Sequence, residues 1–261
     1  MRLRGFAVAL CLIVLGACGG GGGSGSSDAG WTITGTVVDE SGTPVPDAVV
    51  TVDLDETHQA RTDAGGNYRV KLPQRESYPP FFTGVVEKPG MVPEPIFFEY
   101  EKGVVTWTSE TTLEPMRDGD VVFPSSGQVI HLGDSNYAGS INSQFQLRYA
   151  SGTLISESIV LSAERKARYT QLCISMHAKG INPWPEAVRT SLALGAQGTT
   201  APALVRRLPV GDEDGSYSLV RECFPLAGFA AGTVLDLHIR SGLNGSEYDD
   251  FEFIGLRGTF G

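Results

Sequence analysis

The chain has 261 residues, enough for two domains of ordinary size, and its 33 glycines and 15 prolines favour β-sandwiches over helices. The formal charge of −10 at pH 7 repels phosphate backbones and anionic lipid headgroups alike, which argues against nucleic acid as a partner. We therefore expect an all-β protein that does not bind nucleic acid.

The N-terminal segment predicts export and lipid attachment. Arg2 and Arg4 precede an apolar run, Phe6 to Leu15, that is too short to span a bilayer. The next residues, Leu15-Gly16-Ala17-Cys18, resemble a bacterial lipobox, which implies a lipoprotein signal peptide over residues 1–17 and acylation of Cys18. Two or three acyl chains anchor a protein firmly where one does not. An ordinary secretory signal with an incidental cysteine is the alternative.

The lipidated cysteine is followed by a flexible tether. Residues 18–30 are mostly glycine and serine, a composition typical of unstructured linkers. Gly19 directly after Cys18 resembles the class of lipoproteins sorted to the outer membrane, if the host is Gram-negative. We expect a protein of the bacterial cell envelope whose partner is the membrane, through its lipid anchor.

Residues 31–115 have the pattern of a hairpin-rich β module. Ile33 to Val38 alternate with a period of two, Asp39 to Gly42 supply turn residues, and Val49 to Leu54 form a β-branched run. Thr62 to Asn67 form the next turn, and Tyr68 to Leu72 predict the returning strand.

These residues resemble the carboxypeptidase regulatory-like domain, a transthyretin-like sandwich also classed as a carbohydrate-binding-like fold. In that family the module is an accessory that stabilises, spaces or recruits, and it implies no catalytic residue. Asp47 stands where the family commonly has glycine. The matching positions are Gly35, Val37, Asp39, Gly42, Pro44, Ala48, Val50, Thr62, Asp63, Gly66 and Tyr68.

The rest of this module is rich in aromatic residues, which suit either a hydrophobic core or a platform on which a sugar stacks. We expect the core, because a small sandwich needs large apolar side chains for its own interior. The residues are Phe81, Phe82, Phe97, Phe98 and Trp107. An alternating strand over residues 104–113 closes the module, and a change in composition over Glu114 to Gly119 predicts the domain boundary.

Residues 120–261 predict a second sandwich, with about nine short strands separated by turns. Three segments resemble the galactose-binding-like jelly rolls that occur as carbohydrate-binding modules: residues 172–180, 231–241 and 248–253. Thr233 stands where that family often has asparagine. The predicted strands are residues 128–132, 143–149, 154–161, 169–175, 190–194, 204–208, 217–223, 234–240 and 251–257.

The cysteines predict one disulfide. Cys11 leaves with the signal and Cys18 is lipidated, so Cys173 and Cys223 remain as a pair in an exported chain. Closing this loop is worth on the order of 4 kcal/mol in the chain-entropy model. A zinc-thiolate site is the weaker alternative, because the histidines show neither HExxH spacing nor a second cysteine pair beside them.

One segment suggests catalysis. Residues 129–135 resemble the nucleophile block of SGNH or GDSL esterases, with Ser135 in the nucleophile position. Such a serine needs a base and oxyanion donors. The only D-x-x-H pattern ends at His58, upstream in the other module, and the G-x-N-D block is absent. We expect a turn around Ser135 and no enzyme activity.

Two loops of the second module carry candidate binding residues. Trp184, between two prolines, and Tyr248 are candidates for sugar contact, although packing over the sandwich edge explains Trp184 equally well. Asp249 and Asp250, with Asp120 or Glu252, resemble the acidic strand that binds a structural calcium in several jelly rolls; a solvated turn is the alternative.

The prediction is a surface-tethered lipoprotein with two β-sandwich modules that acts without catalysis, through carbohydrate binding by the second module. A structural or adhesion role in the envelope, with envelope proteins as partners, is the alternative, and an exported esterase is a distant third. No cofactor is expected beyond the calcium.

Overall fold

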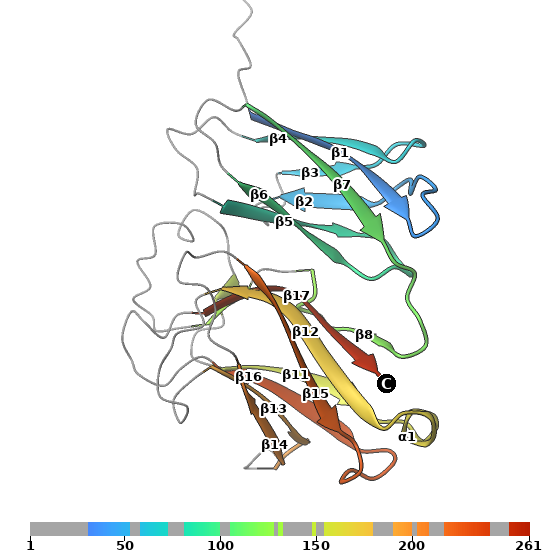
Figure 1. The fold of residues 1–261 in the computed structure, drawn as a ribbon, viewed down its shortest axis with the longest axis vertical. Coiled ribbons are helices and arrows are strands. Elements are labelled where there is room, and N and C mark those ends of the chain that lie inside the picture. Colours follow the sequence, from blue (N-terminus) through green and yellow to red (C-terminus); the bar gives the residue numbers. More distant parts are fainter. Residues whose placement is uncertain are drawn as a thin grey trace, which may run out of the picture.

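The structure is a computed structural model and describes residues 31–52, 58–72, 81–99, 105–127, 130–132, 148–149, 154–179, 190–199, 203–208, 217–240 and 251–261. These residues form strands almost throughout, paired mainly into antiparallel sheets, so the expectation of an all-β sandwich protein is confirmed. Figure 1 shows two stacked sandwiches, with β1–β7 in one and β8–β17 in the other. We call these the N-terminal and C-terminal modules. Among the described residues, no helix is long and apolar enough to cross a membrane.

The N-terminal module packs two sheets face to face, with strand orders β4-β1-β7 and β3-β2-β5-β6. The β1–β7 pairing is parallel and the other pairings are antiparallel. The strands are β1 (Trp31–Asp39), β2 (Val49–Val52), β3 (Gln59–Arg61), β4 (Asn67–Leu72), β5 (Phe81–Glu87), β6 (Glu94–Glu99) and β7 (Thr106–Leu113).

The C-terminal module also has two sheets, with orders β10-β9-β17-β12-β15 and β11-β16-β13-β14, and β8 pairs with β17. Its elements are β8 (Asp120–Val122), β9 (Ile130–Leu132), β10 (Arg148–Tyr149), β11 (Leu154–Val160), α1 (Ala163–Arg168), β12 (Gln171–Lys179), β13 (Ser191–Ala196), β14 (Leu204–Arg207), β15 (Ser218–Pro225), β16 (Val234–Arg240) and β17 (Phe251–Phe260).

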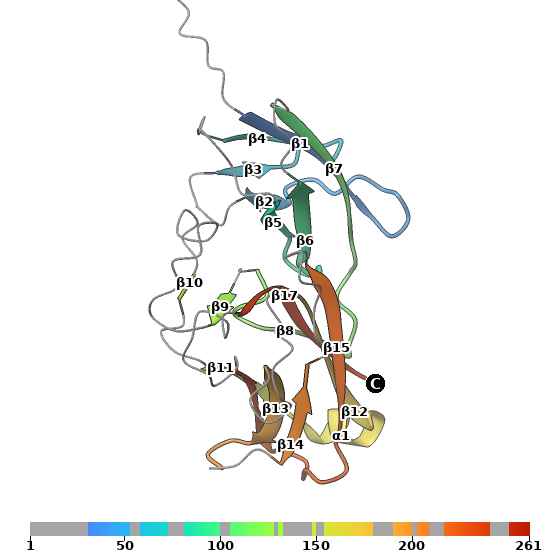
Figure 2. The ribbon, with the colours of Figure 1, turned by 60° about the vertical axis from the view of Figure 1, so that its left-hand side comes forward.

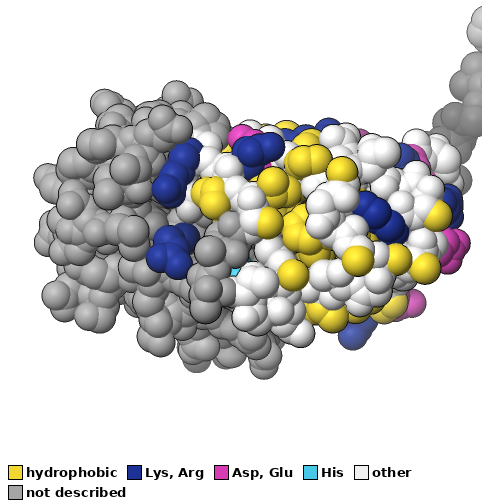
Figure 3. All heavy atoms as spheres, turned by 90° about the horizontal axis from the view of Figure 1, so that it is seen from below, with side chains coloured by type: hydrophobic (Ala, Val, Ile, Leu, Met, Phe, Trp, Pro, Cys, Tyr) yellow, Lys and Arg dark blue, Asp and Glu magenta, His cyan; other side chains and the backbone are white. Residues whose placement is uncertain are grey.

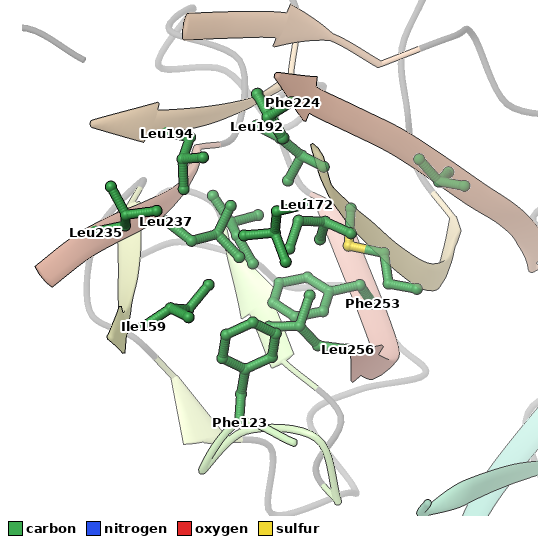
Figure 4. Close-up of a cluster of buried hydrophobic side chains, with 14 of the residues drawn as sticks. Phe123, Ile159, Leu172, Leu192, Leu194, Phe224, Leu235, Leu237, Phe253 and Leu256 are labelled. Atoms are coloured by element: carbon green, nitrogen blue, oxygen red, sulfur yellow. The ribbon is translucent and has the colours of Figure 1, made fainter. Parts of the chain in front are cut away.

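Each module has its own hydrophobic core. Trp31, Ile33, Phe98, Trp107 and Leu113 belong to the core of the N-terminal module. In the C-terminal module, side chains from both sheets point toward one another between the layers (Figure 4). The labelled residues there are Phe123, Ile159, Leu172, Leu192, Leu194, Phe224, Leu235, Leu237, Phe253 and Leu256.

Helix α1 was not predicted from the sequence. Ser162 caps it by accepting a hydrogen bond from the Arg165 amide at 3.1 Å, and Glu164 lies in its first turn. Arg165 stacks over the Phe260 ring at 4.7 Å. A serine cap followed by an acidic first turn was the available sequence signal, but a helix of six residues buries no apolar stripe that a periodicity analysis would detect.

The predicted disulfide is confirmed. Cys173 on β12 and Cys223 on β15 lie directly opposite each other in the antiparallel register and are joined, 50 residues apart in sequence. Because both sulfurs are in the bond, the zinc-thiolate alternative is wrong for these cysteines.

The segment between the modules is attached to both of them. Arg117 forms an ion pair with Glu40 at 2.5 Å, and Asp118 pairs with Arg168 of α1. The Met116 amide donates to the Gly90 carbonyl at 2.9 Å. These contacts reach into both modules, so the segment at the predicted domain boundary, residues 114–119, is fixed in place and does not act as a free hinge.

The turns of the N-terminal module explain several residues of the family signature. Thr62 is buried, its hydroxyl donating to the Val45 carbonyl at 2.6 Å and accepting from the Ala48 amide at 2.9 Å. Gly66 has a positive φ of 75°, and a Cβ there would lie 2.4 Å from the Val37 carbonyl oxygen. Tyr68 packs over Gly35, where a Cβ would lie 2.6 Å from the tyrosine oxygen.

Asp47 is the only non-glycine residue with positive φ in the part of the chain that the structure describes, at 58°. The family commonly has glycine at this position, and the left-handed conformation explains why: a Cβ destabilises this backbone conformation, and glycine has none. Aspartate and asparagine tolerate the conformation better than other residues do.

We predict that Asp47→Gly stabilises the protein by about 0.5–1 kcal/mol, because glycine adopts this φ without steric cost. Asp47→Ala should destabilise it, since alanine has the Cβ without a polar group that bonds locally. Thermal unfolding of both variants measures the effect. Equal unfolding temperatures for the two variants would contradict the assignment.

Asp63 organises the turn before β4. Its Oδ1 accepts hydrogen bonds from the amides of Gly65 at 2.8 Å and Asn67 at 2.9 Å. These bonds, led by that from the Asn67 amide, hold the pKa of Asp63 below its ordinary value of 3.8. Asp39 has a lowered pKa for a similar reason, its main partner being the Ser41 hydroxyl.

Because both pKa values are depressed on folding, the stability from Asp39 and Asp63 is present above pH 3.8 and is lost as the pH falls through the folded-state pKa values. The double variant Asp39→Asn, Asp63→Asn should therefore show a weaker loss of unfolding temperature on acidification than the unchanged protein. Unfolding followed by circular dichroism from neutral pH downward tests this. Parallel curves for the two proteins would refute it.

Candidate ligand-binding cleft between the two modules

The sheet β3-β2-β5-β6 of the N-terminal module turns its outer face toward the C-terminal module. Figures 1 and 2 both place β6 beside β17. The outward-facing Val85 and Pro95 are buried, although the outer face of an antiparallel sheet commonly contacts water. This face is therefore part of an internal contact.

A β-bulge in β17 allows the close approach. Ser175 pairs with Arg257 and His177 pairs with Ile254, so Gly255 and Leu256 together oppose Met176. Gly255 has a φ of 69°, and a Cβ there would lie 3.0 Å from Pro95 Cγ. Bulges bend a strand and change the direction of the side chains beyond it. Here the bulge brings the β17 backbone onto β6, two residues before Arg257.

Aromatic side chains join the modules next to this bulge. The Phe97 ring of β6 lies 5.1 Å, centroid to centroid, from both His177 and Tyr217 of the C-terminal module. Tyr217 is held by Lys179, whose ammonium lies 4.7 Å from the ring centroid and 3.0 Å from Glu252. The Tyr217 hydroxyl also donates to Glu252. Phe97 remains 39% exposed, so part of its ring faces solvent.

A cleft of about 440 Å³ opens beside these contacts, between the edge strands β6 and β7 and below Arg257 of β17. This volume falls in the ordinary range for sites that bind small molecules. Its lining residues are Glu94, Pro95, Ile96, Phe97, Ser109, Glu110, Thr111, Thr112, Glu114 and Arg257. Both modules contribute, the N-terminal one more.

The floor of the cleft is polar because inward-facing positions of the sandwich are polar there. Glu94 of β6 is the register partner of Val86 of β5, a core residue, so its side chain faces the same inward side. On β7, Ser109 and Thr111 share the inward face with Trp107. A core would end in apolar side chains at these positions. The sandwich is thus open at its β6–β7 side, with a carboxylate and two hydroxyls in the opening.

Tyr68 adds an unsatisfied group beneath this floor. Its side chain is buried, and its hydroxyl has no hydrogen-bond partner of ordinary geometry. Burial raises the pKa of Tyr68, and the neighbouring Ser109 side chain offsets part of that rise. Buried polar groups are nearly always hydrogen-bonded, and Ser109 is the neighbouring side chain that influences this hydroxyl.

Burial also governs the charges around the contact. It raises the pKa of Glu94, an effect that the Arg257 guanidinium opposes and the Glu114 carboxylate reinforces. Burial raises the pKa of Glu87, whose Oε1 would lie 2.2 Å from a Cβ at Gly127 of the C-terminal module. Burial, with the Arg257 charge, lowers the pKa of His177. Each of these groups is partly desolvated, which disfavours its charged form.

Most of the residues predicted to bind lie outside the described residues. These are Trp184, Tyr248, Asp249 and Asp250, together with Cys18 and Ser135. The two further acidic residues of the predicted calcium site have other partners: Glu252 pairs with Lys179, and Asp120 accepts from the Arg117 amide at 2.8 Å. Within the described ranges, no group of His, Cys, Asp and Glu side chains is arranged to hold a metal ion.

The expectation that the aromatic residues form the core needs one correction. Phe98 and Trp107 are core residues, but Phe97 is 39% exposed and lines the cleft. The physical reason is the period of two, which sends neighbouring residues of a strand to opposite faces. Alternation along β6 was the signal that separates Phe97 from Phe98. The side chains of Phe81 and Phe82 lie outside the described residues.

Comparison with solved structures finds only low overall likeness. A chlorocatechol 1,2-dioxygenase from Pseudomonas putida shares 19% identity over 34% of this chain and 62% of its own, with a TM-score of 0.26. The TIE protein of Bacillus anthracis shares 13% identity over 81% of this chain and 31% of its own, with a TM-score of 0.27. The major pilin subunit of Bacillus cereus shares 9% identity over 88% of this chain and 58% of its own, with a TM-score of 0.24.

The chain spans less than two thirds of the dioxygenases that it matches. No curated protein matches the chain significantly. Residues 32–93 match the family model described as the carboxypeptidase regulatory-like domain. The residues that formed the predicted signature lie in this range, and the structure gives many of them a defined role in the turns. The chain therefore contains a carboxypeptidase regulatory-like domain at residues 32–93.

Proposed function

We propose that this protein is a lipid-anchored envelope protein that binds carbohydrate without catalysing a reaction, and that its binding site is the cleft between the two modules. The observation that carries the proposal is the composition of the cleft. A partly exposed phenyl ring, Phe97, lies in one opening with the carboxylate of Glu94 and the guanidinium of Arg257.

This combination suits a sugar. An aromatic ring packs against the C–H groups of a pyranose face, while carboxylate and guanidinium groups form charge-assisted hydrogen bonds with hydroxyls. The hydroxyls of Ser109, Thr111 and Thr112 add neutral donors and acceptors along β7. An apolar ligand would leave these groups without partners, which costs free energy.

A close serine–histidine pair elsewhere in the molecule does not favour catalysis. Ser156 Oγ lies 2.8 Å from His238 Nδ1, but the pair is on the outer face of the sheet β11-β16-β13-β14. Asp236, the nearest acid on the same strand face, accepts from the Ser158 hydroxyl at 2.7 Å. A nucleophilic serine requires a base that is itself oriented, and oxyanion donors. The pair is better explained as a surface hydrogen bond.

The module contact favours a second role, as a spacer of fixed shape. Three residues of the N-terminal module lie against residues of the C-terminal module: Phe97, Pro95 and Glu87. These contacts hold the two modules in a fixed relative position. Such a unit could hold envelope proteins at a set distance from the membrane. Figure 3 views the molecule from below the orientation of Figure 1. On this side the described Lys and Arg side chains are dispersed in separate groups among apolar and neutral ones.

Binding is tested with an oligosaccharide array, followed by calorimetry on the best ligand. Phe97→Ala should weaken Kd about tenfold, equivalent to about 1.4 kcal/mol, because the exposed part of the ring, 39% of the residue, would be covered by the ligand. Val205→Ala removes an exposed apolar side chain from β14 and is the matched control. An array without any binding would overturn the proposal.

The variant Trp184→Ala separates the cleft from the loop site predicted from the sequence. We expect it to bind sugar as the unchanged protein does. If Trp184→Ala loses binding while Phe97→Ala retains it, the site lies on the loop and the cleft assignment is wrong.

Lipid attachment is a separate prediction. Cys18→Ala should abolish labelling by a fatty-acid probe and release the protein from the membrane fraction, because Cys18 is the acylated residue of the lipobox. Cys11→Ala changes the other cysteine of the signal segment and should leave labelling intact. Labelling that persists in the Cys18 variant would refute the anchor.

A further inference from the structure

The charge of the cleft restricts the kind of sugar that fits it. Carboxylates approach from several elements: Glu94 from β6, Glu110 from β7 and Glu114 from the segment after β7. Arg257 is the cation among the lining residues. The Arg257 Nε also donates to the Ser175 hydroxyl at 3.2 Å, so part of its hydrogen-bonding capacity is already used within the C-terminal module.

The acidic groups are not arranged for a metal ion. No described group of carboxylate and histidine side chains has the geometry to share one ion, and these carboxylates are distributed around a space of about 440 Å³. Carboxylates that surround a volume of this size suit a polyatomic ligand with a positive charge.

Glu94 is the decisive group because it is both inward-facing and partly buried. Burial and the charge of Glu114 work against its ionised form, and Arg257 compensates only in part, as the raised pKa of Glu94 shows. A hydroxyl donates a neutral hydrogen bond to this carboxylate. An ammonium group gives a charge-assisted hydrogen bond and also supplies a positive counter-charge. Because Glu94 is partly desolvated, the ammonium contributes more binding free energy than a hydroxyl does.

We propose that the cleft selects saccharides that bear a protonated amine, such as hexosamines without an N-acetyl group, over neutral and acidic sugars. This inference rests on the proposed function, since it names the class of sugar that the same cleft binds. In the complex, the ammonium lies between Glu94 and Glu114, and the ring stacks on Phe97. The N-acetyl group of an acetylated sugar would put an uncharged amide in the same place.

The test uses oligosaccharides with one backbone and different groups at carbon 2. β-1,4-linked oligomers of glucosamine, N-acetylglucosamine and glucose are titrated into the protein by calorimetry at pH 6 and low salt. We expect the glucosamine oligomer to bind at least tenfold more tightly than the other two. The preference should shrink as salt is added, because mobile ions screen the charge pair.

Glu94→Gln is the key variant. It keeps the size of the side chain but removes the charge, so the affinity for the glucosamine oligomer should fall about tenfold more than the affinity for the glucose oligomer, and the amine preference should fall by the same factor. Glu164→Gln, on the exposed face of α1, is the control and should change neither value. Unfolding temperatures of the variants verify that each is folded.

The outcomes distinguish the two proposals. If the glucose oligomer binds as tightly as the glucosamine oligomer, or Glu94→Gln retains the full preference, the amine inference is wrong and carbohydrate binding stands. If no oligosaccharide binds, both proposals fail. If a lysine oligomer binds as tightly as the glucosamine oligomer, the cleft recognises the ammonium without the sugar, and the saccharide part of the inference is overturned.

Discussion

The contact between β6 and β17 determines how the two modules of this protein relate to each other. It depends on Gly255, because only a residue without a Cβ can take the positive φ of the bulge while lying against Pro95. Around this point the Phe97 ring packs on His177 and Tyr217, and the segment of residues 114–119 is tied to both sides by Arg117 and Asp118. The modules thereby form one continuous body in place of two tethered domains.

The same contact creates the cleft. The N-terminal sandwich ends at β6 and β7 in polar residues that face inward, an arrangement that would expose the end of its core to water if the module stood alone. Arg257 lies over this opening and supplies a positive charge that partly compensates Glu94. A site of this kind belongs to the junction, so neither module has it alone. This is a common location for ligand sites in proteins of several domains.

The match to the carboxypeptidase regulatory-like domain and the lining of the cleft occupy different parts of the N-terminal module. Its turns are held by side chains that repeat the family signature, such as Asp63 and Thr62, and these lie in the module itself and not in the cleft. The residues that line the cleft come instead from β6, β7, the segment after β7 and β17, and all of them lie after residue 93, where the match to the family model ends. The N-terminal module thus has turns that follow the family signature within residues 32–93, and its cleft-lining residues lie after residue 93.

The sequence by itself determined the strands, the turns, the regulatory-like module and the disulfide, because these depend on local patterns and on composition. Period-two alternation locates a strand, an aspartate before a glycine locates a turn, and the two cysteines outside the predicted signal and lipid-attachment positions have only each other. Only the tertiary structure decided that Phe97 lies against His177 and Tyr217, that the charge of Arg257 reaches Glu94 from the other module, and that Gly255 meets Pro95. Those facts depend on how two sheets far apart in the chain pack against each other, and no local pattern in the sequence encodes that geometry.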